Sequence, residues 1–385
     1  MAAAARPLEI AGISTSVARE YGELRRMEPA WRQLQDEMPN AGVFSSWQWN
    51  QPAARHFCNP SGLHVWLMQS GGEPVALAPL AWSRVMGQRL LSFIGTSLSD
   101  YSRADYQDVL IAEGWEDRAC EALVDELDWL SGSWDVVRLQ ELPATSPLLT
   151  RLPELAHRRG WTVSLLPDSD VYRVELPSDR ETYYERLSGN VRGNAPRKLR
   201  KLQREHGAAI TRIDDPSQLD AAMSTLFELH DLRWHGGREG ILKKQTIFPD
   251  DLTRNFHRDV ARNLLEDGHL DLELLHADGM PIGARYSFEF RGVRSFYASG
   301  YHHDDAWSRF SLGTIMDLHS IDDAIDRGFT AEDLLRGEGE YKQRYAPAHS
   351  VNQRLLIFAS RAAQARYELQ RHLRRVYWKA KLSLT

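Results

Sequence analysis

The predicted elements occur in the same order twice along the chain, and this repeat constrains the fold more than any single motif. In the first half, apolar residues three or four apart predict a helix over residues 20–38, which Pro29 kinks or splits. The sequence Phe44-Ser45-Ser46-Trp47 opens a further helix, with serines placed to cap it. Two apolar strands, 64–69 and 75–82, then flank a Gly71-Gly72 turn.

The first half closes with three strands and a helix. The strands are predicted at 90–93, 106–111 and 134–139, and the helix at 116–130. A polar loop at 97–101 follows the first of these strands.

The second half shows the same order. Helices are predicted at 180–187, 194–206, 216–234 and 248–266, strands at 271–276, 282–290 and 293–300, a helix at 313–326 and a strand at 331–335. Each half therefore consists of helices, a β-meander, a helix and a strand. The chain is predicted to be an α+β protein of two tandem units of roughly 170 residues each. We place the units at 1–170 and 171–358, followed by a basic helix at 359–385.

Composition excludes several classes of protein. The chain has 385 residues, of which 42% are hydrophobic and 12 are Trp, so it can bury sizeable cores. Its net charge of −6 argues against a general polyanion binder such as a DNA-binding protein. The N-terminus lacks a signal-peptide pattern, and no apolar run reaches the roughly 18 residues of a membrane span. Two cysteines, Cys58 and Cys120, fit buried small residues in a reducing cytoplasm.

A cluster of titratable residues follows the last strand of the second half. The stretch 333–345 runs from an apolar strand into a turn that contains Arg336, Gly337, Glu338, Tyr341 and Lys342. Glycine lets the backbone approach a ligand, and ligands of open α/β sheets bind at strand ends. These residues alone fit a polar turn as well as a site.

A helix start at 310–314 is a second candidate feature. Ser311 can cap the helix, and Gly313 allows close approach of the backbone. A helix N-terminus favours phosphate or pyrophosphate. A plain capped helix is the alternative.

The helix 194–206 is strongly basic. It carries Arg197, Lys198, Arg200, Lys201 and Arg204, with Arg192 just before it. The run fits either a solvated face or attraction of a polyanion, such as a phosphorylated donor or a tRNA.

Two histidine-containing segments have ordinary structural explanations. His230, Arg233 and Trp234 share one helix face, where a lone His is more often a core residue. The cluster at 302–305 lacks the spacing of a known zinc site, so we predict a solvated loop and no metal.

Taken together, these segments resemble a known group, the GNAT-superfamily acyltransferases of the CelD/BcsL-like branch, which is named for cellulose biosynthesis. This branch is related to the Fem-type peptidoglycan ligases. The resemblance covers most of residues 20–350 and rests on the order and spacing of loose motifs. These are the segments 44–49, 75–80, 100–108, the basic helix after Arg192, 229–234, 297–301 and 335–342.

The resemblance implies two GNAT-like domains with one active cleft in or beside the second. Such enzymes transfer an acyl group from a thioester to an amine and hold the donor's pyrophosphate in a turn that corresponds to 309–314 here. Acyl-CoA is then a co-substrate, and no cofactor is bound permanently. Fem-type relatives use aminoacyl-tRNA instead, and an aromatic-Lys turn near their donor resembles Tyr341-Lys342.

Chemistry and resemblance together assign roles to individual residues. Glu338 is a candidate base acting through a water, Lys342 stabilises the oxyanion, and Tyr297 or Tyr341 protonates the leaving group. The predicted donor- and substrate-binding residues are Arg192, Asn194, His230, Arg233, Trp234, Arg309, Gly313 and Arg336. Replacing Lys342 with Ala is expected to abolish transfer and to leave the fold intact.

The sequence leaves three functions open. The first is transfer of an acyl group to an amine or hydroxyl of a cell-envelope or exopolysaccharide precursor, with a saccharide or amine as acceptor. The others are an aminoacyl-tRNA-dependent ligase and a non-catalytic binding subunit of polysaccharide biosynthesis. The basic helix at 360–382 either docks on the body or lies on the inner face of an acidic membrane.

Overall fold

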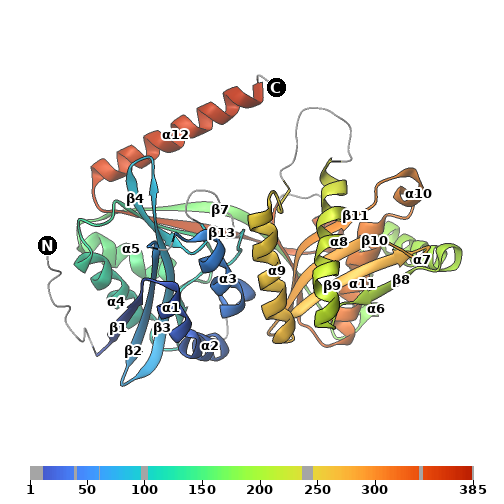
Figure 1. The fold of residues 1–385 in the computed structure, drawn as a ribbon, viewed down its shortest axis with the longest axis horizontal. Coiled ribbons are helices and arrows are strands. Elements are labelled where there is room, and N and C mark those ends of the chain that lie inside the picture. Colours follow the sequence, from blue (N-terminus) through green and yellow to red (C-terminus); the bar gives the residue numbers. More distant parts are fainter. Residues whose placement is uncertain are drawn as a thin grey trace. The chain divides into compact units, whose positions relative to one another are not determined.

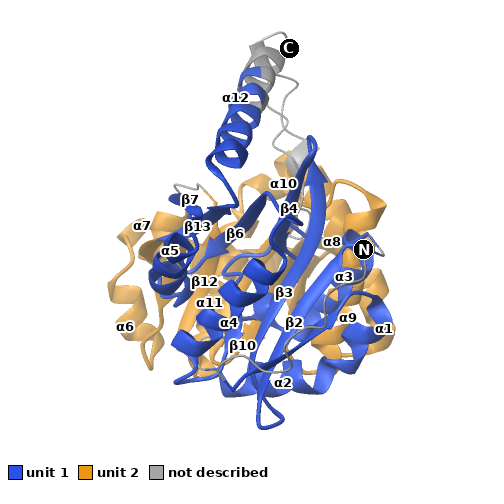
Figure 2. Ribbon diagram, turned by 90° about the vertical axis from the view of Figure 1, so that its left-hand side faces the viewer, with its two compact units in different colours: residues 1–169, 351–385 blue, residues 170–350 orange. Residues whose placement is uncertain are grey.

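The chain forms two compact units. The computed structural model describes residues 12–38, 41–59, 61–96, 103–235, 246–337 and 341–383. Unit 1 comprises 1–169 and 351–385, and unit 2 comprises 170–350 (Figure 2). The sequence analysis assigned residues up to 358 to the second unit. The contacts instead group 351–358 with unit 1, because the strand at Ala348–Phe358 pairs with a strand of that unit.

Unit 1 is a mixed sheet with helices. Its strands lie in the order β1-β2-β3-β4-β6-β13, and β5 pairs with β3. All described pairs are antiparallel except β4 with β6. The strands are β1 Ser14–Ala18, β2 Leu63–Ser70, β3 Glu73–Val85, β4 Gln88–Phe93, β5 Leu110–Ile111, β6 Val136–Leu142, β7 Thr162–Glu175, which continues into unit 2, and β13 Ala348–Phe358. The helices are α1 Tyr21–Arg26, α2 Glu28–Glu37, η1 Val43–Ser45, α3 Trp47–Phe57, α4 Glu116–Trp129, α5 Leu148–Arg158 and α12 Arg361–Ser383.

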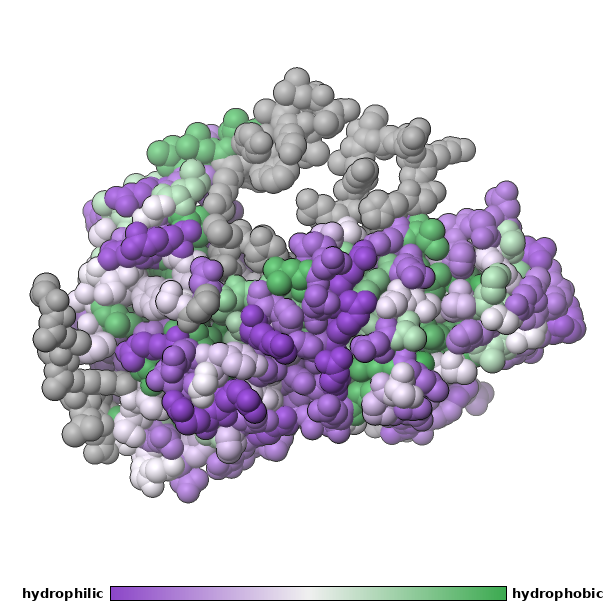
Figure 3. All heavy atoms as spheres, viewed as in Figure 1, coloured by the Kyte–Doolittle hydropathy of each residue, from purple (hydrophilic) through white to green (hydrophobic). Residues whose placement is uncertain are grey.

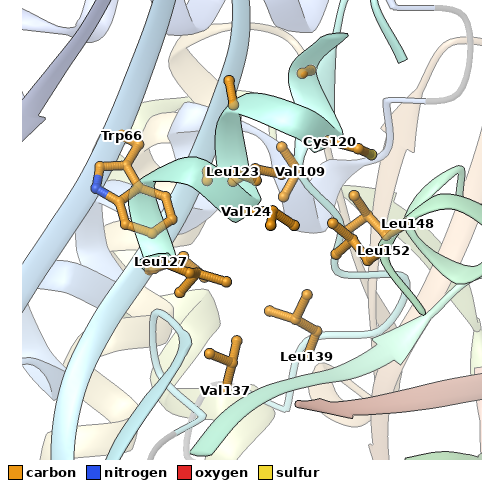
Figure 4. Packing of buried hydrophobic residues seen from close by; sticks show 14 of the residues in the cluster. Trp66, Val109, Cys120, Leu123, Val124, Leu127, Val137, Leu139, Leu148 and Leu152 are labelled. Atoms are coloured by element: carbon orange, nitrogen blue, oxygen red, sulfur yellow. The ribbon is translucent and has the colours of Figure 1, made fainter. Parts of the chain in front are cut away.

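The core of unit 1 lies between its sheet and helices α4 and α5. Leu123 and Leu127 of α4 and Leu152 of α5 pack with Val137 and Leu139 of β6 (Figure 4). Burying one such side chain contributes about 1.5–3 kcal/mol, so this contact accounts for the amphipathic pattern of both helices. Within the same core Cys120 is fully buried, as predicted.

Local sequence signals account for the first helices. Pro29 begins a new helix instead of continuing the old one, so α1 and α2 are separate, as predicted. Ser46 caps α3 by accepting a hydrogen bond from the Trp49 backbone N–H at 3.3 Å. The predicted strand at 106–111 was too long, because only Leu110 and Ile111 pair with β3.

Unit 2 repeats the pattern of unit 1. Its strands lie in the order β7-β12-β11-β10-β9-β8, and β11 and β12 are the parallel pair. The strands that begin in this unit are β8 Ala209–Arg212, β9 Leu270–Ala277, β10 Met280–Phe290, β11 Val293–Tyr301 and β12 Ala331–Arg336. The helices are α6 Arg180–Glu185, α7 Gly189–His206, α8 Pro216–His235, α9 Asp251–Glu266, α10 Asp305–Ser308, α11 Leu312–Asp326 and η2 Lys342–Tyr345. The predicted α+β class with two tandem units is confirmed.

The two faces of the unit 2 sheet carry different helices. Helices α8 and α9 cover one face, and α6, α7 and α11 cover the other (Figure 1).

Two glycines of this sheet let helices approach its strands closely. Gly300 of β11 lies against the backbone of α8, and Gly283 of β10 lies against Met316 of α11.

Charged residues are buried beneath α11. Arg285 is 1% exposed and pairs with Asp317 and Glu332, while Arg294 is fully buried and bonds Glu289 at 2.7 Å. Burial raises the pKa of Glu332 to about 7, although both arginines act to lower it. Burying charge in this way is costly unless every group is paired, so this face of the sheet tolerates few substitutions.

Candidate functional site

The parallel strands β11 and β12 separate after a short pairing. Their ladder covers Val293–Ser295 against Ala331–Asp333, and no later described residue of β11 pairs with β12. On its other edge β11 stays paired with β10 as far as Tyr301. Tyr297 is an extra residue in that ladder, because Ala298 and Phe296 pair with the consecutive residues Tyr286 and Ser287. Such β-bulges are common beside active sites.

A cavity of about 170 Å³ occupies this opening. Four parts of the unit line it: α8, β11, the start of α11, and the turn after β12. The lining residues are Arg233, Phe296, Ser299, Tyr301, Gly313, Thr314, Asp317, Tyr341, Arg344 and Tyr345. A second cavity of about 280 Å³ shares Thr314 and Arg344 with the first, and it extends to α7 through Asn194, Lys198 and Ser311. The two cavities therefore adjoin at the N-terminus of α11.

One carboxylate organises the floor of the first cavity. Asp317 accepts a hydrogen bond from the Tyr345 hydroxyl at 2.8 Å on Oδ2 and pairs with Arg285 through Oδ1. Burial raises the pKa of Tyr345 well above its usual range, with the Asp317 charge adding to the effect. Burial likewise raises the pKa of Tyr341 to about 12. Both phenols therefore stay protonated at neutral pH and can donate protons.

Positive side chains surround the start of α11. Arg233 lies over the Tyr301 ring at 4.6 Å and donates to the Ser299 hydroxyl at 2.8 Å. Lys198 donates to the Ser311 hydroxyl at 2.7 Å. Arg344 is exposed and lines both cavities. Since the first N–H groups of a helix lack partners within the helix, this region suits an anionic ligand.

Four of the predicted site residues meet at these cavities. Arg233, Gly313 and Tyr341 line the first, and Asn194 lines the second. The reason for Gly313 differs from the prediction: a Cβ there would lie 3.1 Å from the Tyr301 ring, so the glycine makes room for Tyr301. The prediction that the Ser311 side chain caps α11 was wrong. Ser311 directly precedes the helix with φ 58°, and its hydroxyl accepts a hydrogen bond from Lys198.

Lys342 lies beside the cavity, and its ammonium group binds backbone carbonyls at the end of β12. The residue is 4% exposed, and its ammonium group donates to the Leu335 and Arg336 carbonyls, each at 2.9 Å. Leu335 has φ 56°, a strained conformation for a side chain of this size, and its N–H bonds the Asp333 carboxylate at 2.8 Å. The structure thus gives Lys342 a structural task in addition to the catalytic one predicted.

Two other predicted residues belong to the sheet face covered by α8 and α9. The Tyr297 hydroxyl lies 3.4 Å from Nε2 of the buried His257. His230 is buried, with Nδ1 2.9 Å from the Ser299 carbonyl oxygen. Neither residue lines a cavity at the start of α11. His230 is the core histidine that its position on the helix suggested.

The remaining predicted residues lie outside the two cavities or outside the described residues. Arg192 is exposed, Arg309 is exposed and lies over the Phe310 ring at 4.8 Å, and Arg336 pairs with Val171 in the sheet. Glu338 and the side chain of Trp234 lie outside the described residues.

Sequence reasoning missed the residues that form the cavity floor. Thr314 and Asp317 are three residues apart on α11, so they share one face of the helix. The helix also carries Asp322, Asp323 and Asp326, so this polar pair did not stand out in the sequence. The sequence contained no signal for Tyr345, because only the turn at η2 brings its hydroxyl to Asp317.

Comparisons with known proteins agree with this architecture. The family described as "Acetyltransferase (GNAT) domain" matches residues 189–343, all within unit 2. The crystal structure of FemX superposes with a TM-score of 0.61 at 12% identity, covering 89% of this chain and 98% of that one. No curated protein matches the sequence.

Two further solved structures share the fold. The C-terminal domain of a lysylphosphatidylglycerol synthetase from Agrobacterium fabrum gives a TM-score of 0.52 at 12% identity, covering 90% of this chain and 96% of that one. L-PGS from Bacillus licheniformis gives 0.51 at 11% identity, covering 87% and 92%. The chain therefore has a GNAT-type acyltransferase fold. Within the part of the chain described, no helix is both long and apolar enough to cross a membrane.

Proposed function

We propose that unit 2 transfers an acyl group from acyl-CoA to an amine or hydroxyl of an acceptor. The observation that carries this proposal is the pair of adjoining cavities where β11 and β12 separate, at the N-terminus of α11. The GNAT acetyltransferase domain match, residues 189–343, includes most of the residues that line both cavities.

The donor is proposed to bind along β11 and the start of α11. Its pyrophosphate meets the free N–H groups of α11, with the cations of Lys198 and Arg344 on either side. The edge of β11 that β12 leaves unpaired offers backbone groups to the amides of the pantetheine chain. The thioester then lies near Tyr341 and Tyr345 in the first cavity.

The chemistry requires loss of a proton from the acceptor and gain of one by the departing thiolate. We assign the second step to Tyr341, because it lines the cavity and its phenol is protonated at neutral pH. Tyr297 is the less suitable donor, since it lies among His257, Tyr286 and Phe288. Glu338 is kept as the proposed base for the acceptor.

The acceptor is proposed to be a saccharide or amine precursor of the cell envelope or an exopolysaccharide. This part rests on the resemblance of the motif set described above. A non-catalytic role in polysaccharide assembly predicts that the cavities bind no acyl-CoA, so a binding test separates the two.

The decisive experiment is a panel of acyl-CoAs, read by thermal shift and by release of free thiol with candidate amines and sugars. We expect at least one acyl-CoA to raise the melting temperature. Lys198→Ala and Arg344→Ala should each raise the acyl-CoA concentration needed for that shift about ten-fold. Lys201→Ala, which changes an exposed base on the same helix as Lys198, is the matched control. Absence of any shift across the panel contradicts donor binding.

A second candidate function is aminoacyl transfer from tRNA. The exposed arginines of α7, namely Arg192, Arg197, Arg200 and Arg204, favour it, and so does the shared fold with FemX. It predicts that aminoacyl-tRNA, and no acyl-CoA, labels an acceptor. Charge-removing variants at Arg197 and Arg200 would then weaken tRNA binding and make it less dependent on salt.

A further inference from the structure

Helix α12 carries an exposed apolar row. Leu369, Leu373 and Val376 are 58%, 51% and 50% exposed, although three such residues in succession on one helix face normally pack against a core. Their spacing of four and three residues places them on one side of the helix. Hydrophobic spheres gather at the outer edge of the molecule along this helix (Figure 3).

Unit 1 contacts a different face of the same helix. Ala363 is buried and its carbonyl accepts a hydrogen bond from Gln88, while Tyr367 packs against Phe358 with ring centroids 5.6 Å apart. Gln370 donates to the Met86 carbonyl at 3.1 Å. Residues 363, 367 and 370 therefore form the docked face, and the apolar row lies about 120° around the helix from it.

The charge of α12 is opposite to that of the whole chain. From Arg361 to Ser383 the sequence contains seven basic residues and one acidic residue, Glu368, whereas the net charge of the chain is −6. The described side chains of Arg361, Arg366 and Arg371 are all exposed. An apolar row on a helix rich in exposed bases is the pattern of helices that lie in a membrane interface.

We propose that α12 binds unit 1 to an anionic lipid surface, with Leu369, Leu373 and Val376 inserted among the acyl chains and the exposed Arg361, Arg366 and Arg371 on the headgroups. Charge complementarity selects this occupant. A second copy of the helix would bring two strongly positive segments together and lose Coulomb energy, whereas an anionic bilayer gains it with every base. The proposal goes beyond acyl transfer, and it can hold or fail whatever donor unit 2 uses.

The test is sedimentation of the full chain with vesicles. We expect binding to vesicles of phosphatidylglycerol and phosphatidylcholine in equal parts, weaker binding at raised salt, and little binding to phosphatidylcholine alone. The double variant Leu369→Asp/Leu373→Asp should lower the affinity at least about ten-fold. Arg371→Glu should lower it by about five-fold or more. Leu252→Asp is the matched control, because Leu252 is 45% exposed on α9 of unit 2.

Each other outcome overturns the proposal. Absence of binding to anionic vesicles, or equal loss in the Leu252→Asp control, shows that α12 is not the binding element. Equal binding to neutral vesicles removes the role of charge. A dimer in sedimentation velocity that the double variant dissolves would assign the apolar row to a second copy. All variants are first compared with the wild type by circular dichroism, and the substituted side chains are exposed, so the fold should be retained.

Discussion

The backbone of Gly300 in β11 lies directly against the backbone of His230 in α8. A Cβ atom at Gly300 would stand 2.2 Å from the His230 nitrogen, much closer than any real contact. This approach lets His230 Nδ1 and Arg233 Nη1 reach the Ser299 carbonyl oxygen, at 2.9 and 3.4 Å. The position of Arg233 at the cavity therefore depends on a glycine outside it.

Gly300→Ala should destabilise unit 2 by about 3 kcal/mol or more, because the atoms in the way are backbone and cannot rotate aside. Urea unfolding measures the loss. Gly193→Ala is the control: no atom lies within 4 Å of its Cβ position in α7, so Ala should be neutral or stabilise by up to about 1 kcal/mol. Equal stability of Gly300→Ala and wild type would mean that α8 is not packed as described.

Replacing Lys342 should cost stability as well as activity. Lys342→Met keeps the length of the side chain but leaves the Leu335 and Arg336 carbonyls without their charged donor, which should lower the free energy of unfolding by about 2 kcal/mol. The earlier expectation of an intact fold is thereby revised. Lys201→Met, at an exposed position, should change stability by less than about 0.5 kcal/mol. If Lys342→Met loses transfer at unchanged stability, the catalytic role alone is supported.

The repeated order of elements could be predicted from local patterns, and so could the segments that build the site. Strands β2 and β3 are nearly continuous runs of buried, mostly apolar residues, and helices α4 and α11 bury residues three or four apart, so local patterns identify all four elements. Strand β13 and helix α5 were missed. β13 has an irregular polar start, and Pro153 inside α5 reads as a helix breaker.

Some site residues could be predicted from the sequence and others could not, and the difference lies in what determines their position. Tyr341, Arg233 and Gly313 lie near the ends of strands or helices, where sequence order already implies the location. Asp317 and Tyr345 meet only through the fold of η2, and Lys342 turns toward its own backbone because buried carbonyls need donors. Contacts of this kind depend on three-dimensional packing, which one sequence does not encode locally.

The two tyrosines proposed as proton donors can be separated by their phenylalanine variants. Tyr341→Phe should lower kcat about 100-fold with little change in stability, since Tyr341 lines the cavity. Tyr297→Phe should retain activity, because its hydroxyl faces His257. Initial rates of thiol release measure both. If Tyr297→Phe loses more activity than Tyr341→Phe, the reaction takes place instead on the face of β11 where Tyr297 meets His257.

Glu332 should make stability fall as the pH rises from about 4.5 to about 7. Its pKa is raised from 4.5 to about 7 by burial, so in this range the folded state holds a proton that the unfolded state has released. More protons bound to the folded state mean that rising pH favours unfolding, by on the order of 3 kcal/mol over the whole range. The raised pKa values of Asp271, to about 6, and of His319 act in the same direction.

The variant Glu332→Gln isolates the contribution of this carboxyl group. Its amide oxygen can still accept from Arg285, but it cannot titrate, so the variant should lose less stability between pH 5 and pH 8 than the wild type loses. Urea unfolding at several pH values gives both slopes. The lowered pKa values of Glu273, Glu289 and Asp323 act only at more acidic pH, where their stabilising charge is lost. Identical slopes for variant and wild type would show that Glu332 is already ionised in the folded protein at pH 5.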